Sequence, residues 1–194
     1  MNLKKVTAVI VLSMVHFLTG YTVLAAELPT EYIGVTINQT QQQAVIEQLG
    51  SAKLQDIPYH EYEQGYCYSS NGTYAILSAN MLADGYAVNH ISIFNQNPDM
   101  SCQMTTKTLP ICIGEFCLGM SRSRIETMLG MRLTQQNNDA DDYVAVFDST
   151  RAITEDERQF ALSDSTKADV SYYITFNFSH DKAKKISIMM FETY

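Results

Sequence analysis

The segment that most constrains the fold of this chain is a short helix with clear start and stop signals, between Ser121 and Gly130. Ser121 is a good N-cap, because its hydroxyl can accept a hydrogen bond from a free backbone N–H of the first turn. Ile125, Met128 and Leu129 are spaced so that they lie on one face of the helix. Gly130 suits the left-handed conformation that ends many helices. The pattern predicts an amphipathic helix packed under a sheet.

A weaker version of this pattern occurs about 80 residues earlier, from Thr40 to Gly50. Val45 occupies the position of Ile125, and Leu49 occupies the position of Leu129. The correspondence includes the terminal glycine of each segment. It indicates that one structural unit is used twice along the chain.

Strand-like runs rich in aromatic and β-branched residues follow each helix. In the first half they are separated by Asn71-Gly72 and Asp84-Gly85, dipeptides that tolerate the positive φ of a tight hairpin. In the second half, Tyr172–Phe178 and Lys185–Phe191 form a predicted hairpin around Ser179–Lys182. The order helix, antiparallel meander, helix, antiparallel meander predicts an α+β fold of two tandem units, with sheets packed against helices.

A second similarity between the halves lies in the strands. His90–Ile93 occupies a position in the first half that corresponds to Lys185–Ile188 in the second, and each segment follows a turn and an aromatic strand. Asn95–Asp99 is the best boundary between the halves, because it is polar and contains a proline. We therefore expect a first repeat unit at residues 27–100, a linker at 101–110 and a second repeat unit at 111–194. Residues 150–165, polar and acidic, form an expected insertion in the second unit.

The first 26 residues are typical of a cleaved signal peptide. Lys4 and Lys5 precede an apolar run from Val6 to Leu18, and small residues end at Ala26. A single membrane anchor is the alternative interpretation. Removing the two lysines changes the formal net charge from −8 to −10. Such acidity disfavours nucleic acid and anionic membranes as partners and would suit a basic protein.

All four cysteines lie in the part expected to be exported. An even count in an oxidising compartment predicts two disulfides, with three possible connectivities. We favour a bond between Cys67 and Cys102, which would tie a strand of the first unit to the segment by which the chain leaves that unit. We also favour a bond between Cys112 and Cys117, which would close a small loop before the second helix. Four thiols could instead bind zinc, but their spacings lack the paired short knuckles of zinc sites. We expect neither a metal nor a cofactor.

The order of elements, with the Gly119–Gly130 motif Gly-Met-Ser-x-x-x-Ile-x-x-Met-Leu-Gly, resembles the tandem β-lactamase inhibitory protein fold. It is also similar to the single-unit outer-membrane assembly lipoprotein family (SmpA/OmlA). The first unit matches this motif only at Thr40–Gly50. The resemblance implies two α/β units whose sheets join to form a concave, partner-binding surface. It also implies a binding or assembly protein rather than an enzyme.

The sequence offers little support for catalysis. It contains no Gly-x-Ser-x-Gly nucleophile motif, and the spacing of Cys112 and Cys117 is not that of a redox pair. His60 and His90 fall on strand-like segments of the same unit and could approach each other, although we favour the interpretation that they are two partly exposed strand residues. A hydrolase that uses either histidine is the hypothesis we favour least. His180 is expected to serve a hairpin turn.

The acidic and basic runs also lack a functional pattern. Asp139–Asp142 lacks the glycine and the distal glutamate of a calcium loop, and Glu155–Glu157 is most simply a solvated loop. The basic run Lys182–Lys185 is not interleaved with aromatic residues. We expect it at an exposed hairpin edge, where it would discourage strand addition.

Six tyrosines are concentrated in the first meander. Alternation along a strand puts Tyr66 and Tyr68 on one face and Cys67 on the other. Because tyrosine combines a large apolar area with one hydroxyl, it is common at interfaces. Covering a small core is the alternative role. The sequence therefore predicts a partner-binding face formed by Tyr59, Tyr62, Tyr66, Tyr68, Tyr74 and Tyr86.

Together these features predict a periplasmic or secreted, non-catalytic protein-binding module with no transmembrane segment in the mature chain. An inhibitor or immunity-type protein is the leading form of this hypothesis. Its partner would be another protein, a basic envelope enzyme being one candidate, and not nucleic acid. The alternative is a factor for the assembly or maintenance of the envelope or outer membrane.

Overall fold

The structure is a computed structural model that describes residues 28–58, 60, 62–81, 87–136, 141–155, 157–160 and 166–193. The predicted signal peptide, residues 1–26, lies outside the described residues. The first half contains β1 (Glu31–Tyr32), β2 (Val35–Thr36), α1 (Gln42–Leu49), β3 (Gln55–Asp56), β4 (Glu63–Ser70), β5 (Thr73–Asn80), β6 (His90–Phe94) and β7 (Gln103–Met104). The second half contains β8 (Cys112–Ile113), β9 (Phe116–Cys117), α2 (Arg122–Leu129), β10 (Thr134–Gln135), β11 (Asp142–Ala152), a 3₁₀ turn (Glu157–Phe160), β12 (Lys167–Ser179) and β13 (Lys182–Thr193).

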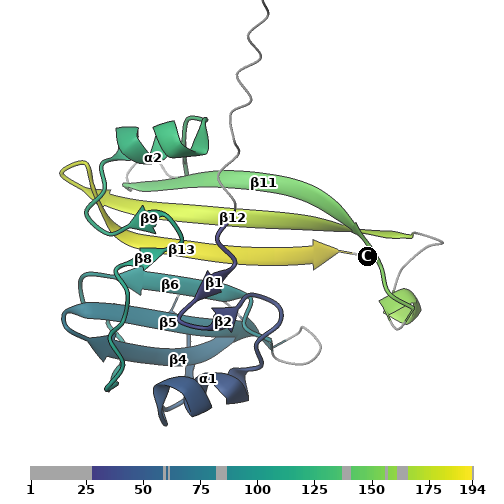
Figure 1. Ribbon diagram of the computed structural model, residues 1–194, viewed down its shortest axis with the longest axis horizontal. Coiled ribbons are helices and arrows are strands. Elements are labelled where there is room, and N and C mark those ends of the chain that lie inside the picture. Colours follow the sequence, from purple (N-terminus) through teal and green to yellow (C-terminus); the bar gives the residue numbers. More distant parts are fainter. Residues whose placement is uncertain are drawn as a thin grey trace, which may run out of the picture.

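One large sheet dominates the structure, and its strands lie side by side from β11 to β4 in Figure 1. The strand order is β10-β11-β12-β13-β6-β5-β4-β3, and every neighbouring pair along this order is antiparallel. The short strand β7 pairs with β4 in parallel. The two remaining ribbons, β1-β2 and β8-β9, are separate two-stranded sheets.

The two meanders meet where β6 pairs with β13. His90 lies opposite Met189 and Phe94 lies opposite Lys185, so all five residues of β6 are paired. Ser92 and Ser187 face each other at the middle of this junction. The two segments whose similarity suggested a repeat are therefore hydrogen-bonded neighbours in one sheet.

The predicted α+β fold of tandem helix-plus-sheet units is wrong. Within the described residues there are two α-helices of eight residues each, whereas β11, β12 and β13 alone contain 11, 13 and 12 residues. The fold is thus a mostly antiparallel β-sheet with two short helices. An unpaired β6 would leave a row of backbone donors and acceptors exposed, and pairing with β13 satisfies them within one sheet.

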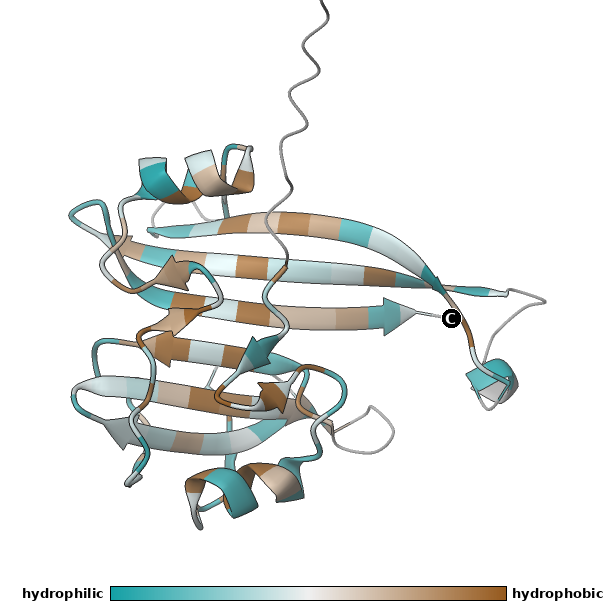
Figure 2. Ribbon diagram, viewed as in Figure 1, coloured by the Kyte–Doolittle hydropathy of each residue, from teal (hydrophilic) through white to brown (hydrophobic). Residues whose placement is uncertain are grey.

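Both helices form where the sequence predicted them and pack against the same face of the sheet. The Ser121 hydroxyl accepts a hydrogen bond from the Arg124 N–H at 3.4 Å, and Gly130 ends α2 with a φ of 66°. Helix α1 begins after Gln41, whose side chain makes no capping hydrogen bond. The apolar positions of the sheet form the brown bands of Figure 2. The shared core includes Val45, Leu49, Ile125, Leu129, Ile91, Ile93, Ile174, Ile186 and Ile188.

Two of the predicted hairpins are confirmed by backbone geometry. Asn71 and Gly72, between β4 and β5, have φ values of 50° and 78°. His180 and Asp181, between β12 and β13, have φ values of 49° and 60°. Both pairs show the positive φ at successive residues that a tight two-residue turn requires. Asp84-Gly85 lies outside the described residues.

The favoured disulfides are present: Cys67 is bonded to Cys102, and Cys112 is bonded to Cys117. Cys67 is fully buried and packs with Ile57 and Ile76 in a second, smaller apolar cluster. Two disulfides are typical of an oxidising compartment outside the cytoplasm. Within the described ranges, no helix has the length and apolar character needed to cross a membrane.

Candidate functional site

The sheet face opposite the helices, called the open face below, differs between the two meanders. Strand register places Cys67 and Ile76 on this face in the first meander. There they are covered by a segment that contributes Met100 and Cys102. Over β11–β13 the same face is only partly covered: Val144 and Ser187 are buried, whereas Val146 is exposed at 38% of its maximal accessibility.

Four residues of the second meander form what we call the apolar patch: Val146, Tyr173, Met189 and Phe191. Val146 pairs with Tyr173, and Tyr173 pairs with Met189, so the three lie in one row across the strands. Phe191 is 41% exposed and meets the Tyr173 ring edge to face, with centroids 5.7 Å apart. A row of apolar side chains on an exposed sheet face is typical of a binding surface.

The charges next to this patch are mainly negative. Asp148 and Asp169 are exposed and lie on the same face, in successive rows beyond Tyr173. The Asp148 carboxylate accepts a hydrogen bond from the Ser171 hydroxyl at 2.6 Å. Lys167 is the next open-face residue along β12. The chain as a whole has 21 acidic residues against 13 basic ones.

A buried chain of hydrogen bonds runs across the open face beside the patch. The Glu63 carboxylate accepts from the Ser78 hydroxyl at 3.1 Å and lies 2.9 Å from His90 Nδ1. His90 Nε2 lies 2.9 Å from the Ser92 hydroxyl, which lies 2.7 Å from the Ser187 hydroxyl. The five residues come from β4, β5, β6 and β13, so the chain crosses the β6–β13 junction.

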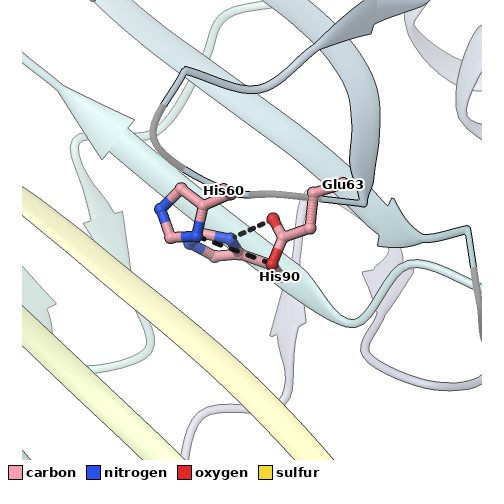
Figure 3. Close-up of side chains that lie close together, drawn as sticks. All are labelled: His60, Glu63 and His90. Atoms are coloured by element: carbon pink, nitrogen blue, oxygen red, sulfur yellow. Dashed lines mark hydrogen bonds and ion pairs between the residues drawn. The ribbon is translucent and has the colours of Figure 1, made fainter.

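A tight turn brings His60 to the same place. The Glu63 N–H donates to the His60 carbonyl at 3.3 Å, and the Ile57 N–H donates to the Glu63 carbonyl at 3.0 Å. Tyr62, within the turn, has a φ of 67°, a left-handed conformation that is uncommon for a residue other than glycine. As Figure 3 shows, His60 then lies against His90, with ring centroids 5.0 Å apart, and both rings lie beside Glu63. The two histidines thus approach each other, and the favoured interpretation of two partly exposed strand residues is wrong for His90, which is buried.

Burial and charge act in opposite directions on this cluster. Burial alone would raise the pKa of Glu63, but the hydrogen bond from His90 and the attraction of both imidazoles outweigh it, so the pKa lies below its ordinary value. Burial lowers the pKa of His60, and the neighbouring His90 lowers it further. Burial also lowers the pKa of Lys185, against the attraction of Asp142 and Glu63.

Ser92, His90 and Glu63 are hydrogen-bonded in the order of a catalytic triad, in which a serine nucleophile contacts a histidine base and the histidine contacts an acidic residue. However, Ser92 is only 2% exposed and His90 only 3% exposed. A substrate could not reach the Ser92 hydroxyl without separating strands of the sheet. We therefore interpret Ser92 as part of a buried polar layer, and the partly exposed His60 beside Glu63 as the side from which the cluster can be reached.

The structure corrects part of the predicted tyrosine face. Tyr66 and Tyr68 are 9% and 0% exposed, and they belong to the core under the helices. The Tyr68 hydroxyl donates to the Gly50 carbonyl at 2.8 Å, so its polar end is also used internally. Because both side chains point away from the open face, they cannot contact a partner there. The predicted alternation, with Cys67 on the opposite face, is confirmed.

The other four tyrosines have mixed outcomes. Tyr62 is 55% exposed in the turn next to His60, and Tyr74 is half-buried on β5. Tyr59 and Tyr86 lie outside the described residues. The expected exposed edge at Lys182–Lys185 is also wrong, because β13 is an interior strand and Lys185 lies over the Phe94 ring.

Sequence reasoning missed Glu63 and the apolar patch. Alternation in β12 could have indicated Tyr173, because the buried residues Ile174, Phe176 and Phe178 define the opposite face. No local pattern marks Glu63, which joins the histidines through the turn and through the pairing of β4, β5 and β6.

Comparisons with known proteins add little to this geometry. No family model matches the chain, and no curated protein matches it. The chain is similar to a solved structure of a DUF4309 family protein, YjgB, from Bacillus subtilis subsp. subtilis str. 168, with a TM-score of 0.45 and 14% sequence identity. That match covers 87% of this chain and 90% of that chain. The resemblance to the β-lactamase inhibitory protein fold stays a prediction.

Proposed function

We propose that this chain is a protein-binding module of the periplasm or the extracellular space, and that it binds a basic partner protein through the apolar patch. The observation that carries the proposal is the aromatic pair on the open face, in which the exposed Phe191 packs against the half-buried Tyr173. Aromatic side chains in such positions supply much of the energy of protein interfaces. Inhibition of an enzyme is one form that this binding could take.

The shape and location of the patch support the proposal. Its residues lie on adjacent strands of a continuous hydrogen-bonded sheet, so the surface is already formed before a partner arrives. A preformed surface lowers the entropic cost of association. The first meander has no equivalent exposed row among its described residues, since Cys67 and Ile76 are covered.

The charge distribution supports a basic partner. Asp148 and Asp169 lie beside the patch, and the formal net charge of the whole chain is −8. Acidic residues around an apolar centre attract a basic protein and disfavour a second copy of the same acidic chain. The proposal therefore commits to a different protein rather than to self-association.

The test is site-specific photo-cross-linking in the producing cell, with the cross-linking residue at position 146 or, as a control, at position 111. Ile111 is a suitable control because it is 53% exposed and lies outside the patch. We expect a discrete adduct with a basic protein from position 146 alone. Phe191→Ala in the same background should weaken the adduct about tenfold or more, because it removes an aromatic anchor.

Other outcomes would contradict the proposal. An equal adduct from position 111 would indicate non-specific contact, and an adduct with the mass of two copies of this chain would indicate self-association. An adduct that persists unchanged in Phe191→Ala would exclude the patch as the binding surface. Circular dichroism of that variant checks its fold, which should be retained because Phe191 is 41% exposed and lies outside the buried core.

A further inference from the structure

We propose that His60, Glu63 and His90 form a binding site for one Zn²⁺ ion at the edge of the open face. Each residue offers one ligand atom, and these atoms lie within 4.8 Å of one another. Two imidazoles and one carboxylate are a donor set that zinc accepts readily, with a water molecule as the fourth ligand. This inference does not depend on the apolar patch or on its partner.

The donor atoms are close enough for side-chain movement to bring them to the spacing of a tetrahedral ion. Zinc bonds of about 2.0–2.1 Å place neighbouring tetrahedral ligand atoms about 3.3 Å apart. His90 Nδ1 lies 2.9 Å from Glu63 Oε2, and His60 Nδ1 lies 3.7 Å from Glu63 Oε1. These two contacts use different oxygens of the Glu63 carboxylate, and one ligand atom from each residue gives a set within 4.8 Å. A closing movement of up to about 1.5 Å, chiefly of the partly exposed His60, would bring the three ligand atoms to this spacing around the ion.

The partners of these residues favour the orientation that coordination needs. His90 Nε2 is held by the Ser92 hydroxyl, so its N–H can donate there while Nδ1 faces Glu63 and the proposed ion. Ser187 in turn contacts Ser92, and Ser78 donates to the Glu63 carboxylate. Hydrogen bonds of this kind around metal ligands fix the tautomer and the angle of the ring.

Of the three residues, His60 is the one whose position is least explained by hydrogen bonds within the protein. Its Nδ1 is 3.7 Å from the nearest Glu63 oxygen, which is too long for a hydrogen bond. The left-handed Tyr62 nevertheless belongs to the turn that holds this ring beside His90. An ion between the two rings and the carboxylate would use all three side chains at once.

The site can be reached from solvent, and its local charge can accept a cation. A surface pocket of about 400 Å³ is lined by Asp56, His60, Tyr62, Glu63 and Met81. It gives the ion and its water ligand a route to the buried Glu63. Lys185 also interacts with Glu63, but Asp142 attracts the same ammonium group and offsets its positive charge.

The test is a titration of the purified, chelator-treated full chain with zinc chloride, followed by isothermal calorimetry. We expect saturable binding of one ion per chain and a rise in melting temperature when zinc is present. His60→Ala and Glu63→Gln should each weaken binding about tenfold or more. Cobalt(II) in place of zinc should give the visible absorption of tetrahedral coordination, and this should disappear in His60→Ala.

The matched control is His180→Asn, which removes an exposed histidine from a turn and keeps a residue that tolerates positive φ. It should bind zinc as the unmodified chain does. His60→Ala changes a partly exposed residue, and circular dichroism should show an unchanged fold. The proposal is overturned if the unmodified chain binds zinc only at millimolar concentration. Equal affinity in His60→Ala, or loss of binding in His180→Asn, would overturn it too.

Discussion

The two disulfides should differ clearly in how much they stabilise the fold, and the difference follows from the loops that they close. Cys67 and Cys102 are 35 residues apart, whereas Cys112 and Cys117 are five apart. A cross-link stabilises a protein largely by restricting its unfolded chain, and the restriction grows with the logarithm of the loop length. The longer loop therefore contributes about 3.8 kcal/mol and the shorter one about 2.1 kcal/mol.

The perturbation is replacement of each pair by alanine while the other pair stays intact. We expect Cys67→Ala with Cys102→Ala to lose at least about 1.7 kcal/mol more free energy of unfolding than Cys112→Ala with Cys117→Ala. Packing adds to the difference, because Cys67 is fully buried against Ile57 and Ile76. In thermal terms the first variant should melt about 8–15 °C lower than the unmodified chain, and the second about 4–8 °C lower.

The assay is urea unfolding of the oxidised proteins followed by circular dichroism, with thermal melts as a second measurement. Thiol quantification before each experiment confirms that the remaining pair is intact. An equal loss in the two variants, or a larger loss in the variant without the short loop, would refute the loop-entropy reasoning. It would show that local geometry around Cys112 and Cys117 matters more than the length of chain enclosed.

Three further substitutions test individual contacts. Tyr68→Phe should cost about 1 kcal/mol at pH 7, because it removes the hydrogen bond to the Gly50 carbonyl. Burial raises the pKa of Tyr68 to about 12 from 10.0, so this group stabilises the fold fully below pH 10 and loses its contribution as the pH rises towards 12. Between pH 8 and 11 the unmodified chain should thus lose about 1.4 kcal/mol more than Tyr68→Phe in urea unfolding, and parallel pH profiles would contradict this. Ser121→Ala should cost about 1 kcal/mol of stability through loss of the N-cap, whereas Ser123→Ala, which removes only the contact between the two hydroxyls, should cost less; equal losses would argue against capping. Gly65→Ala should be strongly destabilising in thermal melts, because a Cβ atom there would lie 2.5 Å from a backbone oxygen of β5, and a normal melting temperature would show that the strands can separate locally.

Features that depend on a few neighbouring residues were predictable from the sequence. The Ser121 cap and the Gly130 stop define α2, and Asn71-Gly72 defines a hairpin, because each acts within one turn of chain. The short Cys112–Cys117 loop was favoured on similar local grounds. These elements required no knowledge of which strands lie side by side.

The arrangement of the strands depends on distant residues and was not predictable in this way. Similarity between His90–Ile93 and Lys185–Ile188 indicated repetition, whereas the structure pairs these segments across the centre of one sheet. Alternation placed Tyr66 and Tyr68 on a common face, but it could not identify that face as the one under the helices. A strand pattern shows which residues share a face and does not show what covers that face.

The candidate sites show the same limit. The approach of His60 and His90 was anticipated from their place in one meander. Glu63 joins them only through the left-handed Tyr62 and the register of three strands, and neither is visible in the sequence. The apolar patch depends on which half of the open face is covered by the segment around Met100.

The junction between β6 and β13 also has a consequence for the order of folding. Ser92 and Ser187 are 95 residues apart, so most of the chain must be made before β6 can meet its neighbour. Contacts between residues so distant in sequence form slowly. During that interval β6 is a free edge next to a formed hairpin, and the matching strand of another molecule could pair with it. Dilute conditions should therefore favour recovery of the monomer on refolding, while crowded conditions should favour chains that have exchanged their β11–β13 segments.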